Sequence, residues 1–142
     1  MESLLVQNDL LKTLRLLAQH LRQANTHDVE KRFLQYTIAC EVLLVGNNHN
    51  RVAISRQFSS KLALIRHLSI KNKQENILYT PIEMQLHFNK IYGMRSTLLH
   101  GREGGFCKKQ LAHYTSILFH TLRLGLNMLV QDPQLLMFLR KS

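Results

Sequence analysis

Two side chains in the second half of the chain are of the types that phosphoryl chemistry needs. Arg95 carries a permanent positive charge that can hold a phosphate, and His100 can act as a general base near neutral pH. Because any protein contains chance Arg-x4-His spacings, the spacing alone is a weak signal. The stronger signal is the position of Arg95, which falls on the apolar stripe of its expected helix.

Three charged residues fall at the centres of apolar stripes when the expected helices are projected at about 100° per residue. They are Arg95, Glu41 and Lys61, each on a different helix. A charge on a buried face is costly unless it is paired, so we expect one connected cluster in which Glu41 lies between the two cations. The stripes contain Met84, Phe88, Ile91 and Leu98 around Arg95; Leu34, Ile38 and Val45 around Glu41; and Ile54, Phe58, Ile65 and Leu68 around Lys61.

This cluster has two interpretations. It is either an internal salt bridge that fixes the helix register, or an arginine anchored by Glu41 so that its guanidinium points into a cleft and binds phosphate. His100 lies about 140° around a straight helix from Arg95. The two share a face only if the helix unwinds at His100, which Gly101 favours, or if they cooperate across a two-fold dimer.

The elements that position these residues are helices. Apolar residues recur with a helical period nearly throughout, over about 5–24, 28–45, 51–70, 81–100 and a long stretch ending near 131, with a short helix beginning at Pro133. Asp28 and Thr80 are predicted N-caps, and Gly101 is a predicted left-handed stop. We therefore predict an all-α protein, a compact bundle of about five to six helices forming one domain over residues 1–142.

The composition limits the class of partner that the protein is expected to bind. The 142 residues include 19 Lys+Arg against 9 Asp+Glu, a formal net charge of +10, with 45% hydrophobic residues. This apolar content excludes a disordered basic tail, and the charge favours a polyanion such as nucleic acid. The two cysteines, Cys40 and Cys107, cannot form a disulfide framework, and the longest apolar run is the four residues 42–45. A cytoplasmic protein with no membrane association is expected.

The positive charge is concentrated in one region, because no acidic residue occurs between positions 42 and 74. His113 and His120 share a helix face but have no nearby carboxylate, so no metal and no other cofactor is expected. The six candidates for contacts with the phosphates of RNA are Arg51, Arg56, Arg66, Arg102, Lys108 and Lys109.

The segment Ile91-Tyr92-Gly93-Met94-Arg95-Ser96-Thr97-Leu98-Leu99-His100-Gly101 closely resembles the signature of the HEPN superfamily, the R-x4–6-H helical ribonucleases. It is most similar to the ApeA-like branch, with tyrosine, two residues, Arg-Ser, three residues and His-Gly. Residues 38–44 resemble the apolar-Glu-apolar segment of the family. Residues 58–65 resemble its third helix, in which Lys61 stands where arginine is common. The resemblance covers roughly residues 28–128.

The resemblance implies a helical bundle that forms a homodimer, with both Arg-x4-His motifs facing a shared basic cleft. Such enzymes cleave RNA without a metal, by attack of a ribose 2′-hydroxyl on the adjacent phosphate, and leave 2′,3′-cyclic phosphate ends. By this resemblance, Arg95 and His100 would be catalytic, with Ser96, Glu41 and Lys61 in supporting roles. A function in phage defence is implied, as is regulation by an antitoxin or another regulatory protein.

Two departures from the wider family keep an alternative open. Ser96 stands where many HEPN nucleases have Asn, although Ser is common in the ApeA-like branch, and no Tyr follows two residues after His100, as it does in the toxin branch. The alternative is a non-catalytic HEPN module that binds RNA or a protein partner. A helix-turn-helix DNA-binding protein is disfavoured, because the expected helices are too long.

Overall fold

The computed structural model describes residues 2–44, 51–73, 80–101 and 105–141, and these residues form helices and connecting turns with no strand. The predicted all-α class is therefore confirmed. The helices of this part of the chain are α1 (Glu2–Gln23), α2 (Val29–Leu44), α3 (Arg51–Lys73), α4 (Pro81–Leu99), α5 (Lys108–Gln131) and α6 (Pro133–Lys141). None of them combines the length and the apolar character that crossing a bilayer requires.

The ends of the helices follow the predicted signals. The Thr80 hydroxyl accepts a hydrogen bond from the Glu83 backbone N–H at 3.2 Å at the start of α4. Asp28 Oδ1 accepts from the N–H groups of Glu30 and Lys31 at 3.1 and 3.3 Å at the start of α2. Each cap satisfies backbone donors that the first turn leaves without a partner. Gly101, with φ of +68°, makes the left-handed turn after α4.

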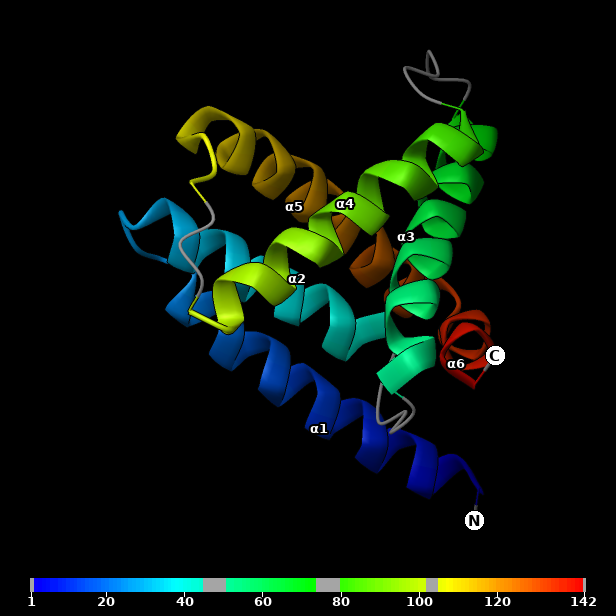
Figure 1. Ribbon diagram of the computed structural model, residues 1–142. Coiled ribbons are helices and arrows are strands. Elements are labelled where there is room, and N and C mark those ends of the chain that lie inside the picture. The colour runs from blue at the N-terminus through cyan, green and yellow to red at the C-terminus, as the bar shows by residue number, and fades with distance from the viewer. Residues whose placement is uncertain (1, 45–50, 74–79, 102–104, 142) are drawn as a thin grey trace.

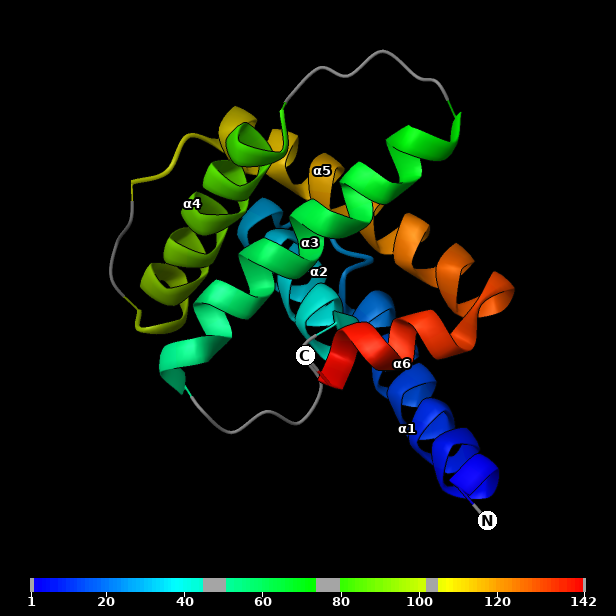
Figure 2. The ribbon, with the colours of Figure 1, turned by 90° about the vertical axis from the view of Figure 1, so that its right-hand side faces the viewer.

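Helix α2 lies in the middle of the bundle, between α1 and α5 (Figure 1). Helices α3 and α4 pack against each other and also contact α2. After α5 the chain turns, and α6 folds back to contact both α5 and α2 (Figure 2). The N-terminal part of α1 extends beyond the other helices in both views. Five helices thus contact α2, which carries Glu41.

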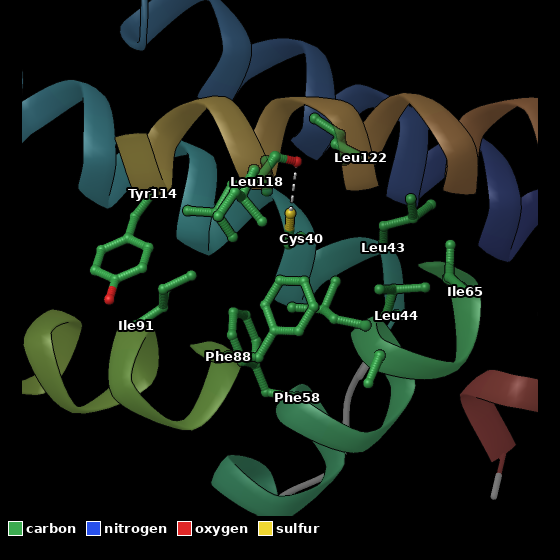
Figure 3. Packing of buried hydrophobic residues seen from close by; sticks show 14 of the residues in the cluster. Cys40, Leu43, Leu44, Phe58, Ile65, Phe88, Ile91, Tyr114, Leu118 and Leu122 are labelled. Atoms are coloured by element: carbon green, nitrogen blue, oxygen red, sulfur yellow. Dashed lines mark hydrogen bonds between the residues drawn. The ribbon is translucent and has the colours of Figure 1, made fainter. Parts of the chain in front are cut away.

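The core lies where α2, α3, α4 and α5 meet (Figure 3). Its large, fully buried side chains come from all four of these helices. The polar groups inside are satisfied locally: the hydroxyls of Thr37, Thr115 and Thr121 each donate to the carbonyl four residues earlier. The Cys40 thiol donates to the Leu118 carbonyl at 3.6 Å, and burial raises the pKa of this thiol. Core members drawn in Figure 3 include Leu43, Leu44, Phe58, Ile65, Phe88, Ile91, Leu118 and Leu122.

Candidate active site

Arg95 and Glu41 form an ion pair between α4 and α2. Arg95 Nη2 lies 2.7 Å from Glu41 Oε2, and the two side chains are 16% and 21% exposed. Both atoms of the contact belong to charged groups with little access to water, so their mutual attraction is only weakly screened. The expected pairing of these residues is confirmed.

An aromatic ring covers the guanidinium of Arg95. The Cζ atom of Arg95 lies 5.2 Å from the centroid of the Tyr92 ring, within the range of a cation–π contact. Tyr92 precedes Arg95 by three residues on α4 and therefore lies on the same side of the helix. The ring is itself fixed from α3, because its centroid is 5.3 Å from that of the buried Phe58. Glu41 and Tyr92 together hold Arg95 in one orientation.

These neighbours also act on Tyr92. Burial raises the pKa of the Tyr92 hydroxyl above its ordinary value, the positive charge of Arg95 lowers it, and the negative charge of Glu41 raises it again. The phenol therefore stays protonated near neutral pH. In the sequence Tyr92 stands out only as part of the motif, with no role of its own. Its spacing of three residues before a charged residue on an apolar stripe was the signal for this contact.

Lys61 is buried, as its place in an apolar stripe predicts, with 6% of its surface exposed. Its Nζ donates to the Leu44 carbonyl at 3.4 Å and to Gln57 Oε1 at 3.3 Å. Leu44 is the last residue of α2, three residues beyond Glu41, whereas Gln57 lies on α3, one turn before Lys61. The last carbonyls of a helix lack partners within it and form the negative end of its dipole, which attracts an ammonium group. Lys61 thus binds the end of the helix that carries Glu41.

His100 is exposed and caps the C-terminal end of α4. Its backbone N–H still donates to the Ser96 carbonyl at 3.1 Å, a helical i→i−4 bond, and the chain turns only at Gly101. The helix ends at His100, whose ψ of 7° lies outside the helical range, while its bond to the Ser96 carbonyl keeps its place as the next residue of the last turn. His100 stays about 140° around the axis from Arg95, and the two side chains do not share a face within one chain. Ser96, which lies between these two residues in the sequence, is half-buried.

The candidate phosphate contacts fall in three groups. Arg56, Lys108 and Lys109 are exposed, on α3 and on the first turn of α5. Arg66 is half-buried on α3. The side chains of Arg51 and Arg102 lie outside the described residues. The residues described include no group of three or more His, Cys, Asp or Glu side chains that could hold a metal ion.

Comparisons of the chain with protein-family models, with curated proteins and with solved structures give no match.

Proposed function

We propose that this chain is a metal-independent endoribonuclease of the HEPN superfamily that acts as a homodimer in the cytoplasm, in phage defence. The observation that carries the proposal is the held guanidinium of Arg95, five residues before an exposed histidine at the end of the same helix. A cation fixed in advance can stabilise the charge that develops on a phosphate without the cost of reorganising at the moment of reaction.

The proposed reaction uses no group from outside the chain and its RNA. The 2′-oxygen of a ribose attacks the adjacent phosphorus while the bond from phosphorus to the 5′-oxygen breaks. His100 acts as base and then as acid: it accepts the proton of the 2′-hydroxyl, and the resulting imidazolium gives a proton to the leaving 5′-oxygen. The products are a 2′,3′-cyclic phosphate and a 5′-hydroxyl. In this scheme Arg95 stabilises the pentacoordinate phosphorane, and Ser96, Glu41 and Lys61 support the site.

A second copy of the chain is part of the proposal because Arg95 and His100 lie on different sides of α4. The side of α4 that carries His100 also exposes Ile82 and Leu86, which are 73% and 62% exposed. Gly93 lies on this side as well, and a Cβ atom there would meet nothing within 4 Å. Ile82 and Leu86 lie at the start of α4, about 21–27 Å along the axis from His100, and could contribute to a contact between two copies. In the proposed dimer the histidine of one copy acts with the arginine of the other.

The test is cleavage of single-stranded RNA in the presence of a metal chelator. Wild type is expected to produce fragments that end in a cyclic phosphate, and His100→Ala is expected to abolish them. His67→Ala removes an exposed histidine from α3 and serves as the matched control. RNA left intact by wild type, or cleaved equally well by His100→Ala, would refute the catalytic proposal.

One observation favours a second candidate, a non-catalytic HEPN module that binds RNA or a protein such as an antitoxin. Arg95 is only 16% exposed and its charge is already neutralised by Glu41, as in a purely structural ion pair. This candidate predicts RNA binding without cyclic phosphate products, and binding that survives His100→Ala. The same cleavage and binding assays therefore separate the two functions.

A further inference from the structure

The outer face of α5 has no acidic residue of its own and carries two cations, one in the first turn and one about two turns before the last residue. No Asp or Glu occurs between Lys108 and Gln131. Lys109, His113, His120 and Arg123 fall within about 80° around the helix, and all four are exposed. The opposite face is buried in the core through Leu111, Leu118, Leu122 and Leu129. Lys109 and Arg123 are separated by about 21 Å along the axis, at 1.5 Å per residue.

Exposed rings lie between these two cations. Phe119 is 44% exposed, and its ring packs edge-on against Tyr36 of α2, with centroids 6.0 Å apart. The His120 ring lies 5.6 Å from that of Phe119. One group of rings therefore joins α2 and α5 at the surface, braced from beneath by a partly buried tyrosine.

A second group of rings lies one to two turns nearer the start of α5. His113 is 5.8 Å from the buried Tyr114, which is 6.2 Å from His87 of α4. Seven residues separate His113 from His120, or about 10 Å along the axis. His113 and His120 are thus spaced along one helix face, and the ring group of each includes a tyrosine: Tyr114 of α5 itself beside His113, and Tyr36 of α2 behind Phe119 and His120.

We infer that this face, made of Lys109, His113, Phe119, His120 and Arg123 and called the α5 stripe below, binds single-stranded RNA. Cations that follow the backbone, alternating with rings on which unpaired bases stack, are the combination by which proteins hold single strands. A base-paired duplex hides the flat faces of its bases from such rings. The inference rests on the proposed function only for the choice of RNA as the nucleic acid.

The experiment measures binding of fluorescent 12-nucleotide 2′-O-methyl RNA by anisotropy at several salt concentrations. This RNA lacks the attacking 2′-hydroxyl, so binding is measured whether or not the protein is a nuclease. Lys109→Gln with Arg123→Gln is expected to reduce the slope of log affinity against log salt by about 1.4, because each phosphate contact to a single strand contributes about 0.7. Phe119→Ala with His120→Ala is expected to weaken binding roughly 5- to 150-fold while leaving the slope unchanged.

The chain offers matched controls. Lys12→Gln with Arg15→Gln removes two exposed cations from α1. Phe138→Ala removes from α6 a phenyl ring that is 68% exposed. Both are expected to change affinity less than twofold, and circular dichroism with urea unfolding checks that every variant folds. Equal loss of binding in controls and α5 variants, tighter binding to vesicles containing phosphatidylserine, or tighter binding to the matching duplex would overturn the inference. Binding through the α5 stripe without cleavage of ordinary RNA would uphold it and refute the nuclease.

Discussion

Arg95 Nη2 of α4 lies 2.7 Å from Glu41 Oε2 of α2, with both side chains mostly removed from water. The contact links the helix that carries the candidate catalytic motif to the helix at the centre of the bundle. Because the two charges have lost most of their hydration, each depends on the other. The same pair therefore stabilises the fold and sets the direction of the guanidinium.

The first prediction concerns the cost of breaking this pair. Glu41→Gln should lower the free energy of unfolding by about 1–3 kcal/mol, because it leaves the arginine charge without its counter-charge. The loss is smaller than for a fully buried pair, since both residues keep some contact with water. Urea unfolding followed by circular dichroism measures it.

The double variant Glu41→Met with Arg95→Met is the control for that prediction. It removes both charges and leaves apolar side chains of suitable size, so it should be more stable than Glu41→Gln. The variant would be inactive if Arg95 is catalytic, which separates the structural role from the chemical one. A double variant that is less stable than Glu41→Gln would contradict the description of the pair as mutually dependent.

The second prediction compares two glycines within helices. A Cβ at Gly125 would lie 2.8 Å from Leu43 Cδ2 in the packed core, whereas one at Gly93 would meet nothing within 4 Å. Gly93→Ala should raise the free energy of unfolding by about 0.5–1 kcal/mol, the ordinary gain in helix propensity. Gly125→Ala should lower it by about 1 kcal/mol, because displacing a buried leucine costs more than that gain. Opposite signs in parallel urea titrations are the expected result.

The third prediction distinguishes the two cysteines. Cys107 is exposed and Cys40 is buried, so a thiol reagent such as Ellman's should modify one thiol in the native protein and two in urea. Burial raises the pKa of Cys40, so the folded state retains this proton at alkaline pH where the unfolded chain loses it. The contribution of the buried Cys40 thiol to the free energy of unfolding is constant below the ordinary thiol pKa of about 8.5. Above that pH it falls by up to about 1.4 kcal/mol per pH unit. Cys40→Ala should show a shallower alkaline decline in stability than wild type.

Sequence periodicity predicts most of the fold because helix ends and apolar stripes are local properties. The caps at Asp28 and Thr80, the stop at Gly101 and the burial of Lys61 all followed from neighbouring residues. The pairing of Arg95 with Glu41 also followed, since two opposite charges on buried faces need each other. Projection places a residue on a face and does not say which neighbouring group is nearest. For that reason the sequence predicts that Lys61 lies in the cluster with Glu41, but it does not identify the Leu44 carbonyl and the Gln57 side chain to which the Lys61 ammonium donates.

Two features of the site depend on three-dimensional detail. One is the way in which α4 ends: the His100 N–H keeps its bond to the Ser96 carbonyl while its ψ of 7° leaves the helical range and the chain turns at Gly101. The contact of Tyr92 with Arg95 depends on the side-chain rotamers, and the ring is held in place by Phe58 from α3. Neither the end of α4 nor the contact between Tyr92 and Arg95 can be predicted from the residue types along a single helix.

The last prediction concerns Tyr92, whose titration reports on both charges of the ion pair. Burial raises the pKa of its hydroxyl, Arg95 opposes this because a cation favours the phenolate, and Glu41 adds to it because an anion disfavours the phenolate. Arg95→Met should therefore move this pKa higher, and Glu41→Gln should move it lower. The titration of each tyrosine hydroxyl can be followed by carbon-13 NMR of labelled Cζ. The chain has four tyrosines, and the signal that is missing in Tyr92→Phe identifies Tyr92. Shifts in the same direction for both variants would show that Tyr92 senses a change in burial and not the two opposite charges beside it.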